Sequence, residues 1–354
     1  MYLHALATAV PPKHVRQDEC LQLITSSENF SRLSRRSRLT LQTILRGDSG
    51  VAARHFAFTP IEEVFRASAD TLNLCFREES PRLAGRALAD ALEQAGLRPP
   101  QLDALLICTC TGYLCPGVTS YVAETLGLRS DAYLQDLVGL GCGAAIPALR
   151  SAAAILAAQP AATVACVAVE ICSAAFYLDD DPGVIVSACL FGDGAAATIW
   201  RATPPNSSAP RPLPPLRATG FNTLHIPEAR DHIRFEQRFG KLRNILTPAV
   251  PALAADAAAR LFAAESADQP RPARILSHPG GRDVLDAIEA ALPGHSLDFS
   301  RRVLRKHGNM SSPSVLFALD LALREAPPPA PDSPWWLVGF GAGFSAHSCR
   351  LVAG

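Results

Sequence analysis

The chain has 354 residues, of which 48% are hydrophobic and 19% are charged, and this composition predicts a globular protein with a large core. Thirty-three basic residues balance 33 acidic ones, and zero net charge argues against nucleic acid as the main partner. No apolar run has the length of a membrane-spanning helix, so no integral membrane contact is expected.

The first half of the chain alternates short apolar runs with longer runs of helical periodicity. We expect strands over 2–10, 102–108, 161–169 and 187–200, the last one broken by a glycine-rich bend, and helices over 81–96, 116–126 and 144–158. Glu170 closes the apolar run that begins at Ala161. Helical contacts are expected within residues 15–48 from Leu33, Leu39, Leu41 and Ile44.

The second half repeats this order after a proline-rich segment, 203–215, which we interpret as a linker. Helices are expected over 252–264, 282–292 and 314–325, and strands over 273–277, 335–338 and 345–352. Phe191-Gly-Asp-Gly and Phe340-Gly-Ala-Gly each form a glycine bend near the end of a half. The pattern predicts a layered α/β fold with two duplicated halves, 1–202 and 216–354.

Ten cysteines are present, and most of them lie in apolar segments. They form no CxxC pair and no Cys/His spacing typical of a zinc site, so we expect no metal and no disulfide framework. The N-terminus lacks the basic start of a signal peptide. These features predict a cytoplasmic protein.

Cys142 stands between two glycines, after a short apolar run and before the helix expected from Ala144. At a helix N-terminus, unpaired N–H groups and the helix dipole favour a thiolate, and the glycines leave room for a substrate. The pattern therefore indicates a nucleophile. The alternative is a small buried cysteine of structural importance only.

Two further residues could assist such a nucleophile. His278 ends an apolar strand and precedes Pro-Gly-Gly and a helix, a position that points into the crevice where α/β sheets bind ligands. The alternative for His278 is a loop histidine bonded to backbone. Asn309 could be a helix cap, but Ser311 or Ser312 can supply that cap and leave the Asn309 amide free to donate into a site.

Five motifs occur in the order and approximate spacing of type III polyketide synthases, the chalcone-synthase-like enzymes of the thiolase fold, and the chain resembles them from about Tyr2 to Leu351. They are Gly-Cys-Gly around Cys142, Leu-Phe-Gly-Asp-Gly at 190–194, His-Pro-Gly-Gly at 278–281, Gly-Asn-Met-Ser-Ser at 308–312 and Gly-Phe-Gly-Ala-Gly at 339–343. The segments 108–117 and 240–246 look most like bacterial alkylresorcinol and alkylpyrone synthases.

The resemblance implies a role for each matched residue. Cys142 matches the nucleophile that accepts the acyl group, and His278 and Asn309 match the pair that stabilises the enolate and the thioester oxygen. Phe191 matches an aromatic gate between the CoA tunnel and the cavity, and Arg54, with Gly50, resembles a segment near the CoA entrance. We therefore expect the Cys142 thiolate to be held by a His278 imidazolium.

Other implications concern substrate and assembly. Cys110 and Cys115, with Gly112 between them, match positions that tune cavity volume, and their small size favours a medium- or long-chain acyl-CoA starter. Cys115 also matches a residue that reaches into the partner's cavity, which implies a homodimer. The chain departs from the family at Ala342, where proline is common, and near Asn244, where plant members have a second gate phenylalanine.

The function implied is iterative decarboxylative condensation of malonyl-CoA onto an acyl-CoA starter, followed by cyclisation to an alkylpyrone or alkylresorcinol. CoA thioesters are its substrates, and no metal or redox cofactor is called for. One alternative is a ketoacyl-synthase III-type condensing enzyme of fatty-acid synthesis, which acts once on an acyl-carrier protein. Another is a non-catalytic thiolase-fold subunit, which would be expected to lose one of Cys142, His278 or Asn309.

Overall fold

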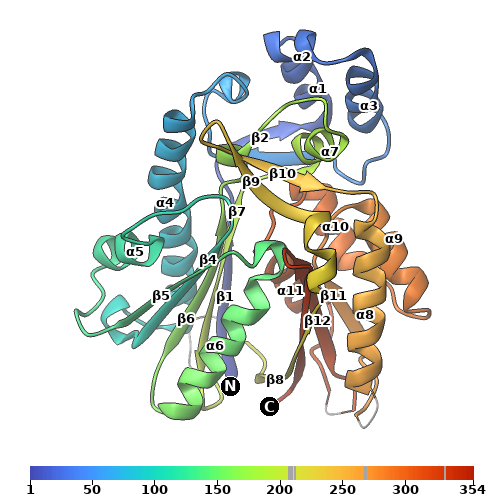
Figure 1. Cartoon of the computed structure of the whole chain (residues 1–354). Coiled ribbons are helices and arrows are strands. Elements are labelled where there is room, and N and C mark those ends of the chain that lie inside the picture. The colour runs from blue at the N-terminus through green and yellow to red at the C-terminus, as the bar shows by residue number, and fades with distance from the viewer. Residues whose placement is uncertain (206–209, 211–212, 267–268, 331) are drawn as a thin grey trace.

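Nine strands form one continuous sheet through the centre of the molecule, in the order β11-β12-β13-β8-β1-β7-β6-β4-β5 (Figure 1). The computed structural model describes residues 1–205, 210, 213–266, 269–330 and 332–354. The first half supplies β1 (Tyr2–Ala9), β4 (Ala104–Thr109), β5 (Tyr133–Val138), β6 (Val164–Glu170) and β7 (Gly194–Arg201). The second half supplies β8 (Leu216–His225), β11 (Arg274–Ser277), β12 (Trp335–Gly341) and β13 (Ser345–Ala353).

Strand pairing repeats between the halves. In the first half β4 is parallel to β6, whereas β6–β7 and β7–β1 are antiparallel. In the second half β11 is parallel to β12, whereas β12–β13 and β13–β8 are antiparallel. The halves meet where β1 pairs with β8, and the predicted duplication is confirmed. Of the predicted linker, residues 206–209 and 211–212 lie outside the described residues.

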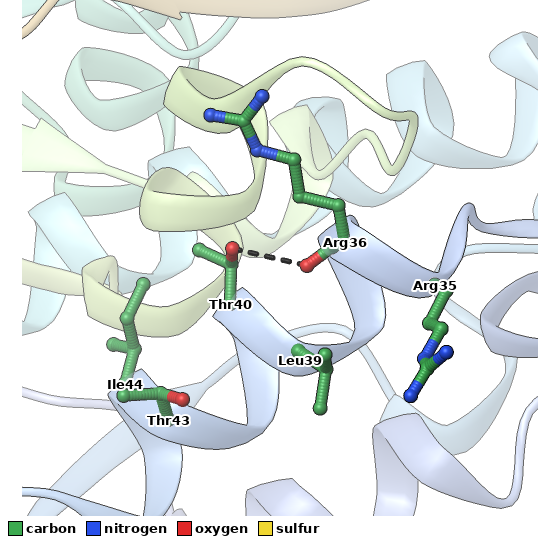
Figure 2. Close-up of a pocket in the computed structure, with 6 residues that line it drawn as sticks. All are labelled: Arg35, Arg36, Leu39, Thr40, Thr43 and Ile44. Carbon is green, nitrogen blue, oxygen red and sulfur yellow. Dashed lines mark hydrogen bonds between the residues drawn. The ribbon is translucent and has the colours of Figure 1, made fainter.

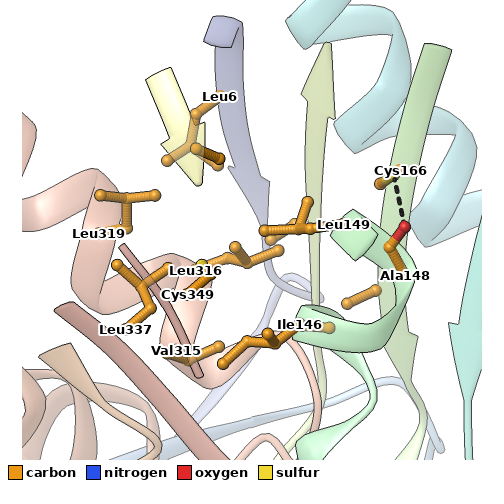
Figure 3. Packing of buried hydrophobic residues seen from close by; sticks show 14 of the residues in the cluster. Leu6, Ile146, Ala148, Leu149, Cys166, Val315, Leu316, Leu319, Leu337 and Cys349 are labelled. Carbon is orange, nitrogen blue, oxygen red and sulfur yellow. Dashed lines mark hydrogen bonds between the residues drawn. The ribbon is translucent and has the colours of Figure 1, made fainter. Parts of the chain in front are cut away.

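Two helices lie between the halves. Because successive side chains of a strand point to opposite faces of the sheet, each half has one face that can pack against these helices. Cys166 of β6 and Leu337 of β12 join one buried cluster with Leu149 of α6 (Ala145–Ala158) and Leu316 of α11 (Ser314–Glu325) (Figure 3). Both sheet halves therefore bury one face against the same central pair of helices (Figure 1).

The opposite faces of the sheet are covered by the outer helices. Leu105 and Ile107 of β4 pack with α4 (Ala69–Ala95) and α5 (Val118–Leu126). Trp336 and Val338 of β12 pack with α8 (Val250–Ser266) and α9 (Arg282–Ala291). The result is the five-layered helix–sheet–helix–sheet–helix arrangement of the predicted fold class (Figure 1).

The remaining elements lie mostly at one end of the sheet, the upper end in Figure 1. They are α1 (Gln17–Thr25), α2 (Glu28–Arg32), α3 (Arg35–Arg46), α7 (Pro182–Leu190), α10 (Asp298–His307), the pair β2 (Lys13–Arg16) and β3 (Ala53–Phe56), and the hairpin of β9 (Ile233–Arg238) and β10 (Lys241–Leu246). Of these, α1 to α3 were expected as helical contacts, although Leu39 is 54% exposed instead of packed.

Two element predictions were wrong. Helix α4 begins at Ala69 and continues through Pro81, because a proline removes one hydrogen bond whereas the preceding turns bury Leu72 and Phe76. Residues 187–190 belong to α7 and not to a strand, because Asp181 accepts hydrogen bonds from the backbone at the start of this helix. In the described part of the chain, no helix combines the length and apolarity needed to span a membrane.

Candidate active site

The turn that contains Cys142 and the glycine-rich loop at 339–343 pack closely against each other at the junction of the halves. Cys142 lies in one 3-10 turn, Gly141–Gly143, directly before α6. A side chain on Gly141 would come within 2.8 Å of the Ala342 backbone nitrogen, and one on Gly341 within 2.9 Å of the Cys142 nitrogen. Gly141 also has a φ of +60°, which favours glycine. Both glycine motifs are therefore required by this close approach.

His278 and Asn309 are positioned by backbone hydrogen bonds at the ends of their elements. His278 follows β11, donates its N–H to Val338 (2.8 Å), and packs its ring edge-on to Phe340. Asn309 follows α10; its side-chain amide donates to the Gly280 carbonyl (3.0 Å) and its side-chain oxygen accepts from the Ser311 backbone (2.8 Å). Both side chains are buried.

Cys142, His278, Asn309 and Phe191 line one cavity of about 600 Å³. Its other walls come mainly from α3, α7, α9 and the segment that follows β10. The structure therefore brings together four residues that are distant in the sequence. Beyond Cys142 and Phe191 lies an inner pocket of only about 30 Å³, to which Cys110, Asn244 and Ser311 contribute.

The loop of Phe191 and the loop of Asn309 are joined directly. The Asn309 N–H donates to the Leu190 carbonyl (2.9 Å), and the Gly192 N–H donates to the Asn309 carbonyl (3.0 Å). Phe191 and Asn309 therefore form an isolated parallel bridge between the halves. Any movement of one loop is transmitted to the other through these two bonds.

Ser311 and Glu170 are site residues that sequence reasoning missed. The Ser311 hydroxyl lies 3.2 Å from the sulfur of Cys142, 3.2 Å from that of Cys110 and 3.3 Å from Glu170. Its φ of +58° is in the left-handed region, a strained conformation for serine. Glu170 is fully buried and accepts hydrogen bonds from Thr109, Cys110, Thr111, Ser311 and Ser312.

A signal for both missed residues was present in the sequence. Glu170 ends a buried strand, and a charged group at that position faces the edge of the sheet where ligands bind. Ser311 and Ser312 were assigned to capping, which is wrong: neither caps α11, and their hydroxyls donate to Glu170. The Asn309 side chain is also partly engaged: its amide donates one hydrogen bond to Gly280 and its oxygen accepts from the Ser311 backbone, which leaves the second N–H of the amide as the donor for a ligand.

The expected thiolate–imidazolium pair is contradicted by the electrostatics of the site. Burial raises the pKa of Cys142 to about 12, and Glu170 adds to this, although hydrogen bonding from Ser311 opposes it. Burial also lowers the pKa of His278 to about 3. Two groups removed from water each favour their neutral form, so the resting pair is a thiol and an imidazole. His278 Nδ1 has no partner among the described residues.

Two residues assigned from the sequence lie elsewhere than expected, whereas Cys115 is exposed at the surface of the single chain. Gly112 packs against the Phe76 ring, where a larger residue would collide. Arg54 does not line a CoA entrance: it is 1% exposed and donates to the carbonyls of Ala188 (2.8 Å) and Phe191 (3.0 Å). Only Cys110 of the proposed cavity-tuning residues lines the inner pocket.

A surface groove of about 620 Å³ adjoins the catalytic cavity along α3 (Figure 2). Arg35, Arg36 and Leu39 line it, and Thr43 and Ile44 belong to both spaces. The groove is thus a cationic approach to the cavity mouth. Within the described ranges, no group of three or more His, Cys, Asp or Glu side chains could hold a metal ion.

A buried cysteine, histidine and asparagine in one cavity, at the junction of two duplicated α/β halves, define a condensing enzyme of the thiolase-like class. Comparison with known families agrees. Residues 3–210 match the family described as "FAE1/Type III polyketide synthase-like protein", and residues 271–344 match "Chalcone and stilbene synthases, C-terminal domain". The chain belongs to the type III polyketide synthase family, and it is therefore an acyltransferase.

Individual relatives support this membership. The chain is 31% identical to 1,3,6,8-tetrahydroxynaphthalene synthase of Streptomyces peucetius subsp. caesius, over 98% of this chain and 92% of the relative. It is 30% identical to 3,5-dihydroxyphenylacetyl-CoA synthase of Streptomyces toyocaensis, over 78% and 74%. The crystal structure of tetrahydroxynaphthalene synthase from Streptomyces coelicolor A3(2) has the same fold, with a TM-score of 0.85 at 24% identity over 100% and 99% of the two chains.

Proposed function

We propose that this enzyme extends an enzyme-bound acyl group with malonyl-CoA in repeated decarboxylative condensations, and that Cys142, His278 and Asn309 perform the chemistry. The observation that carries the proposal is the cavity of about 600 Å³ lined by these three residues and Phe191. CoA thioesters are the only reactants the proposed chemistry needs.

In the first step, His278 accepts the proton of the Cys142 thiol as the sulfur attacks the thioester carbonyl. The C–S bond to CoA breaks, CoA leaves as a thiol with the proton returned from His278, and the acyl group stays on Cys142. His278 lines the same cavity as Cys142, which places an imidazole beside the thiol to take this proton. The Ser311 hydroxyl, 3.2 Å from the sulfur, stabilises the developing thiolate.

In the second step, malonyl-CoA loses its carboxylate as CO2, and the electron pair of the broken C–C bond moves into the thioester as an enolate. His278 and Asn309 hydrogen-bond the enolate oxygen. The apolar wall at Phe191 disfavours the carboxylate and favours uncharged CO2. The enolate carbon then attacks the Cys142 thioester, the C–S bond to Cys142 breaks, and the sulfur leaves as a thiolate that takes up a proton. The product is a β-ketoacyl-CoA longer by two carbons, which returns to Cys142 with loss of CoA for the next cycle. The arginines of the α3 groove are placed to attract the phosphates of CoA.

The starter and product divide this proposal into two versions. In the first, a medium- or long-chain fatty acyl-CoA gives an alkylpyrone or alkylresorcinol, and each buried methylene contributes roughly 0.8 kcal/mol. In the second, a short starter gives a small hydroxylated aromatic ring. The inner pocket of about 30 Å³ favours the second version, as do the products in the names of the two bacterial relatives.

A substrate panel separates these versions. The measurement is kcat/KM for hexanoyl-, dodecanoyl- and 4-coumaroyl-CoA with malonyl-CoA, beside malonyl-CoA alone, with products identified by mass spectrometry. Rising kcat/KM with starter length supports the first version, and equal or better turnover of malonyl-CoA alone supports the second. Turnover without carrier protein excludes the ketoacyl-synthase III alternative.

The catalytic assignment is tested by Cys142→Ala, which should abolish extension while the fold, monitored by circular dichroism, is kept. Cys115→Ser is the matched control and should still be acylated at Cys142, because Cys115 is exposed outside the described cavities. Product formation near the parental rate by the Cys142→Ala variant would contradict the assignment of Cys142 as the nucleophile.

We also propose that the enzyme is a homodimer that pairs through β5. This strand is the outermost of the sheet, and its Tyr133, Leu134 and Val138 are exposed. Unpaired apolar edges of this kind favour association with a second copy. The exposed Cys115 belongs to the loop that ends at Gly117, and Gly117 packs against Asp136 of β5, so Cys115 is displayed beside the same edge.

A further inference from the structure

Arg54 is the most deeply buried arginine in the described core, and the chemistry above does not use it. It lies on β3, 1% exposed, with its guanidinium 5.1 Å from the centre of the Phe56 ring. Removing a guanidinium from water is costly unless fixed partners replace the hydration. Its partners here are backbone carbonyls of the segment that carries Phe191.

The first contact sets the position of Phe191. The same Nη1 atom of Arg54 donates to the Ala188 carbonyl in the last turn of α7 (2.8 Å) and to the Phe191 carbonyl just after it (3.0 Å). Carbonyls at a helix C-terminus lack partners within the helix and carry partial negative charge. A cation at this point therefore stabilises the C-terminus of α7 and the position of Phe191, which directly follows it.

The second contact involves the loop of Asn309. A side chain on Gly308 would come within 2.9 Å of the Arg54 Cγ atom, so the stem of Arg54 fills the space beside this glycine. Gly308 has a φ of +69° and directly precedes Asn309. Arg54 is thus packed between the two loops that form the Phe191–Asn309 bridge.

The strand that carries Arg54 is anchored to both loops as well. The Asp193 N–H donates to the His55 carbonyl (2.9 Å), and the Asp193 carboxylate accepts from the Ala57 N–H (2.7 Å). On the other side, the Ala52 N–H donates to the carbonyl of Arg305 in α10 (2.7 Å). With its backbone held at both ends, Arg54 has little freedom to follow a displaced loop.

We propose that Arg54 is a positioning residue that sets the separation of Phe191 and Asn309, and that it thereby controls the decarboxylation of malonyl-CoA without acting on the Cys142 sulfur. This rests on the proposed function. Decarboxylation needs the apolar wall of Phe191 and the amide of Asn309 on opposite parts of one malonyl group, so their separation is critical. The Cys142 turn is held instead by Gly341 and Ser311, neither of which contacts Arg54 in the described bonds.

The test measures the two sides of the site separately, without reliance on the identity of the starter. Alkylation of Cys142 by iodoacetamide reports the sulfur, and release of CO2 from malonyl-CoA in a Cys142→Ala background, where no acyl group can be loaded or extended, reports Phe191 and Asn309. In the latter reaction the enolate takes a proton from water and leaves as acetyl-CoA. The variants are Arg54→Lys and Arg54→Gln; lysine keeps the charge but has a single nitrogen on a flexible stem.

We expect CO2 release at saturating malonyl-CoA to fall about tenfold or more, because small misplacements of reacting groups have effects of this size. The KM for malonyl-CoA should change little, and alkylation of Cys142 should stay within about twofold. The loss of CO2 release should be smaller in Arg54→Lys than in Arg54→Gln. In an Asn309→Ala background the Arg54 substitution should have little further effect, since both act on one interaction.

Arg350 supplies the matched control. It is also a buried arginine, and it is bound to Glu265 (2.5 Å) and the Pro270 carbonyl (2.9 Å) in the second half, away from the cavity. Arg350→Lys should lower the thermal midpoint without a selective loss of CO2 release. If Arg54→Gln fails to fold, Arg54→Lys carries the comparison.

Two results would overturn the role of Arg54: equal loss of alkylation and CO2 release, which indicates general support of the site, or no loss of either. Additive effects of Arg54→Gln and Asn309→Ala would also contradict it. Failure of the proposed function is recognised separately, since the parental enzyme would then release no CO2 from malonyl-CoA.

Discussion

At the sulfur of Cys142, burial and hydrogen bonding shift the pKa in opposite directions. Burial disfavours the thiolate because a charge loses its hydration in an apolar cavity, whereas the Ser311 hydroxyl favours the thiolate by donating to it. Burial dominates, and the thiol stays protonated at neutral pH. With the thiol and His278 both neutral at rest, the nucleophilic role that we propose for Cys142 requires the thiolate to form during the attack.

This balance predicts the pH dependence of alkylation. Because iodoacetamide reacts with the thiolate, the rate of Cys142 alkylation should rise with pH, with an apparent pKa above the value of about 8.5 for free cysteine. Ser311→Ala removes the group that lowers the pKa, so its rate at pH 8 should be lower than that of the parent. The measurement is the second-order rate constant between pH 6 and 10, with the modified cysteine identified by peptide mass spectrometry.

Thr40→Ala is a suitable control, since Thr40 lies in the α3 groove and bonds only to the Arg36 carbonyl among the described residues (Figure 2). The pH profile of Cys142 alkylation in this variant should match that of the parent. An apparent pKa of Cys142 below that of free cysteine would support the thiolate–imidazolium pair and contradict the neutral resting state.

Residue identity could be predicted from the sequence much better than electrostatics. The motifs located Cys142, His278 and Asn309, and the structure brings all three to one cavity. The charge state was predicted wrongly because a helix N-terminus is visible in a sequence, whereas the depth of burial is not. Arg54 was misplaced for the same reason: a short motif match does not show whether a side chain faces solvent or two carbonyls.

At the scale of elements, the β9–β10 hairpin closes the inner pocket and is attached by a charge cluster centred on Arg243. Arg243 of β10 is mostly buried and pairs with Asp179 (2.8 Å), Asp181 (3.2 Å) and Glu236 (2.8 Å). Two of these carboxylates lie at the start of α7, so the cluster attaches the hairpin to that helix. Asn244, the next residue, lines the inner pocket.

Arg243→Gln should loosen this attachment. We expect a loss of about 1–2 kcal/mol in the free energy of unfolding, discounted because the carboxylates are partly exposed. A less confined inner pocket should also release more short, incompletely extended products. Thermal melts and the ratio of short to full-length products by mass spectrometry test both effects.

Arg260→Gln is the control, because Arg260 forms only an exposed pair with Asp256 on α8 (3.5 Å). It should leave both quantities unchanged. An unaltered product ratio in Arg243→Gln would show that the hairpin does not limit chain growth.

The hairpin also illustrates which elements the sequence did not reveal. Strands that are buried on both faces and therefore read as continuous apolar runs, such as β4, β6 and β12, were predicted, as was α11 with its exact bounds. Strands β5, β9 and β10 were not, because their residues are mostly half-buried or exposed and their patterns resemble a polar loop. Helix α10 was missed because charged residues interrupt its narrow apolar stripe.

At the scale of the whole molecule, the open edge at β5 is the surface through which we propose that the enzyme forms a dimer. Leu134→Glu places a charge in the centre of the proposed interface and should convert the dimer to a monomer, because burying an unpaired carboxylate is costly. Multi-angle light scattering at micromolar concentration measures the change. Leu39→Glu, at another exposed leucine, on α3, should remain dimeric.

A monomeric parental enzyme with full activity would contradict the proposed dimer, and so would a Leu134→Glu variant that stays dimeric. If the dimer is confirmed, activity of the Leu134→Glu monomer measures how far the cavity depends on Cys115 of the second copy.

The contact between the Gly141–Gly143 turn and the Gly339–Gly343 loop bears on how such enzymes can be recombined. Each loop leaves no room for a side chain on the other, so the two halves of the duplicated gene have lost the freedom to diverge separately at these points. A chimera that joins the first half of this chain to the second half of a relative combines two contacting loops from different proteins, which are not matched to each other. To keep Cys142 in position, both loops should be exchanged together. Exchange of whole halves at the proline-rich linker would separate them.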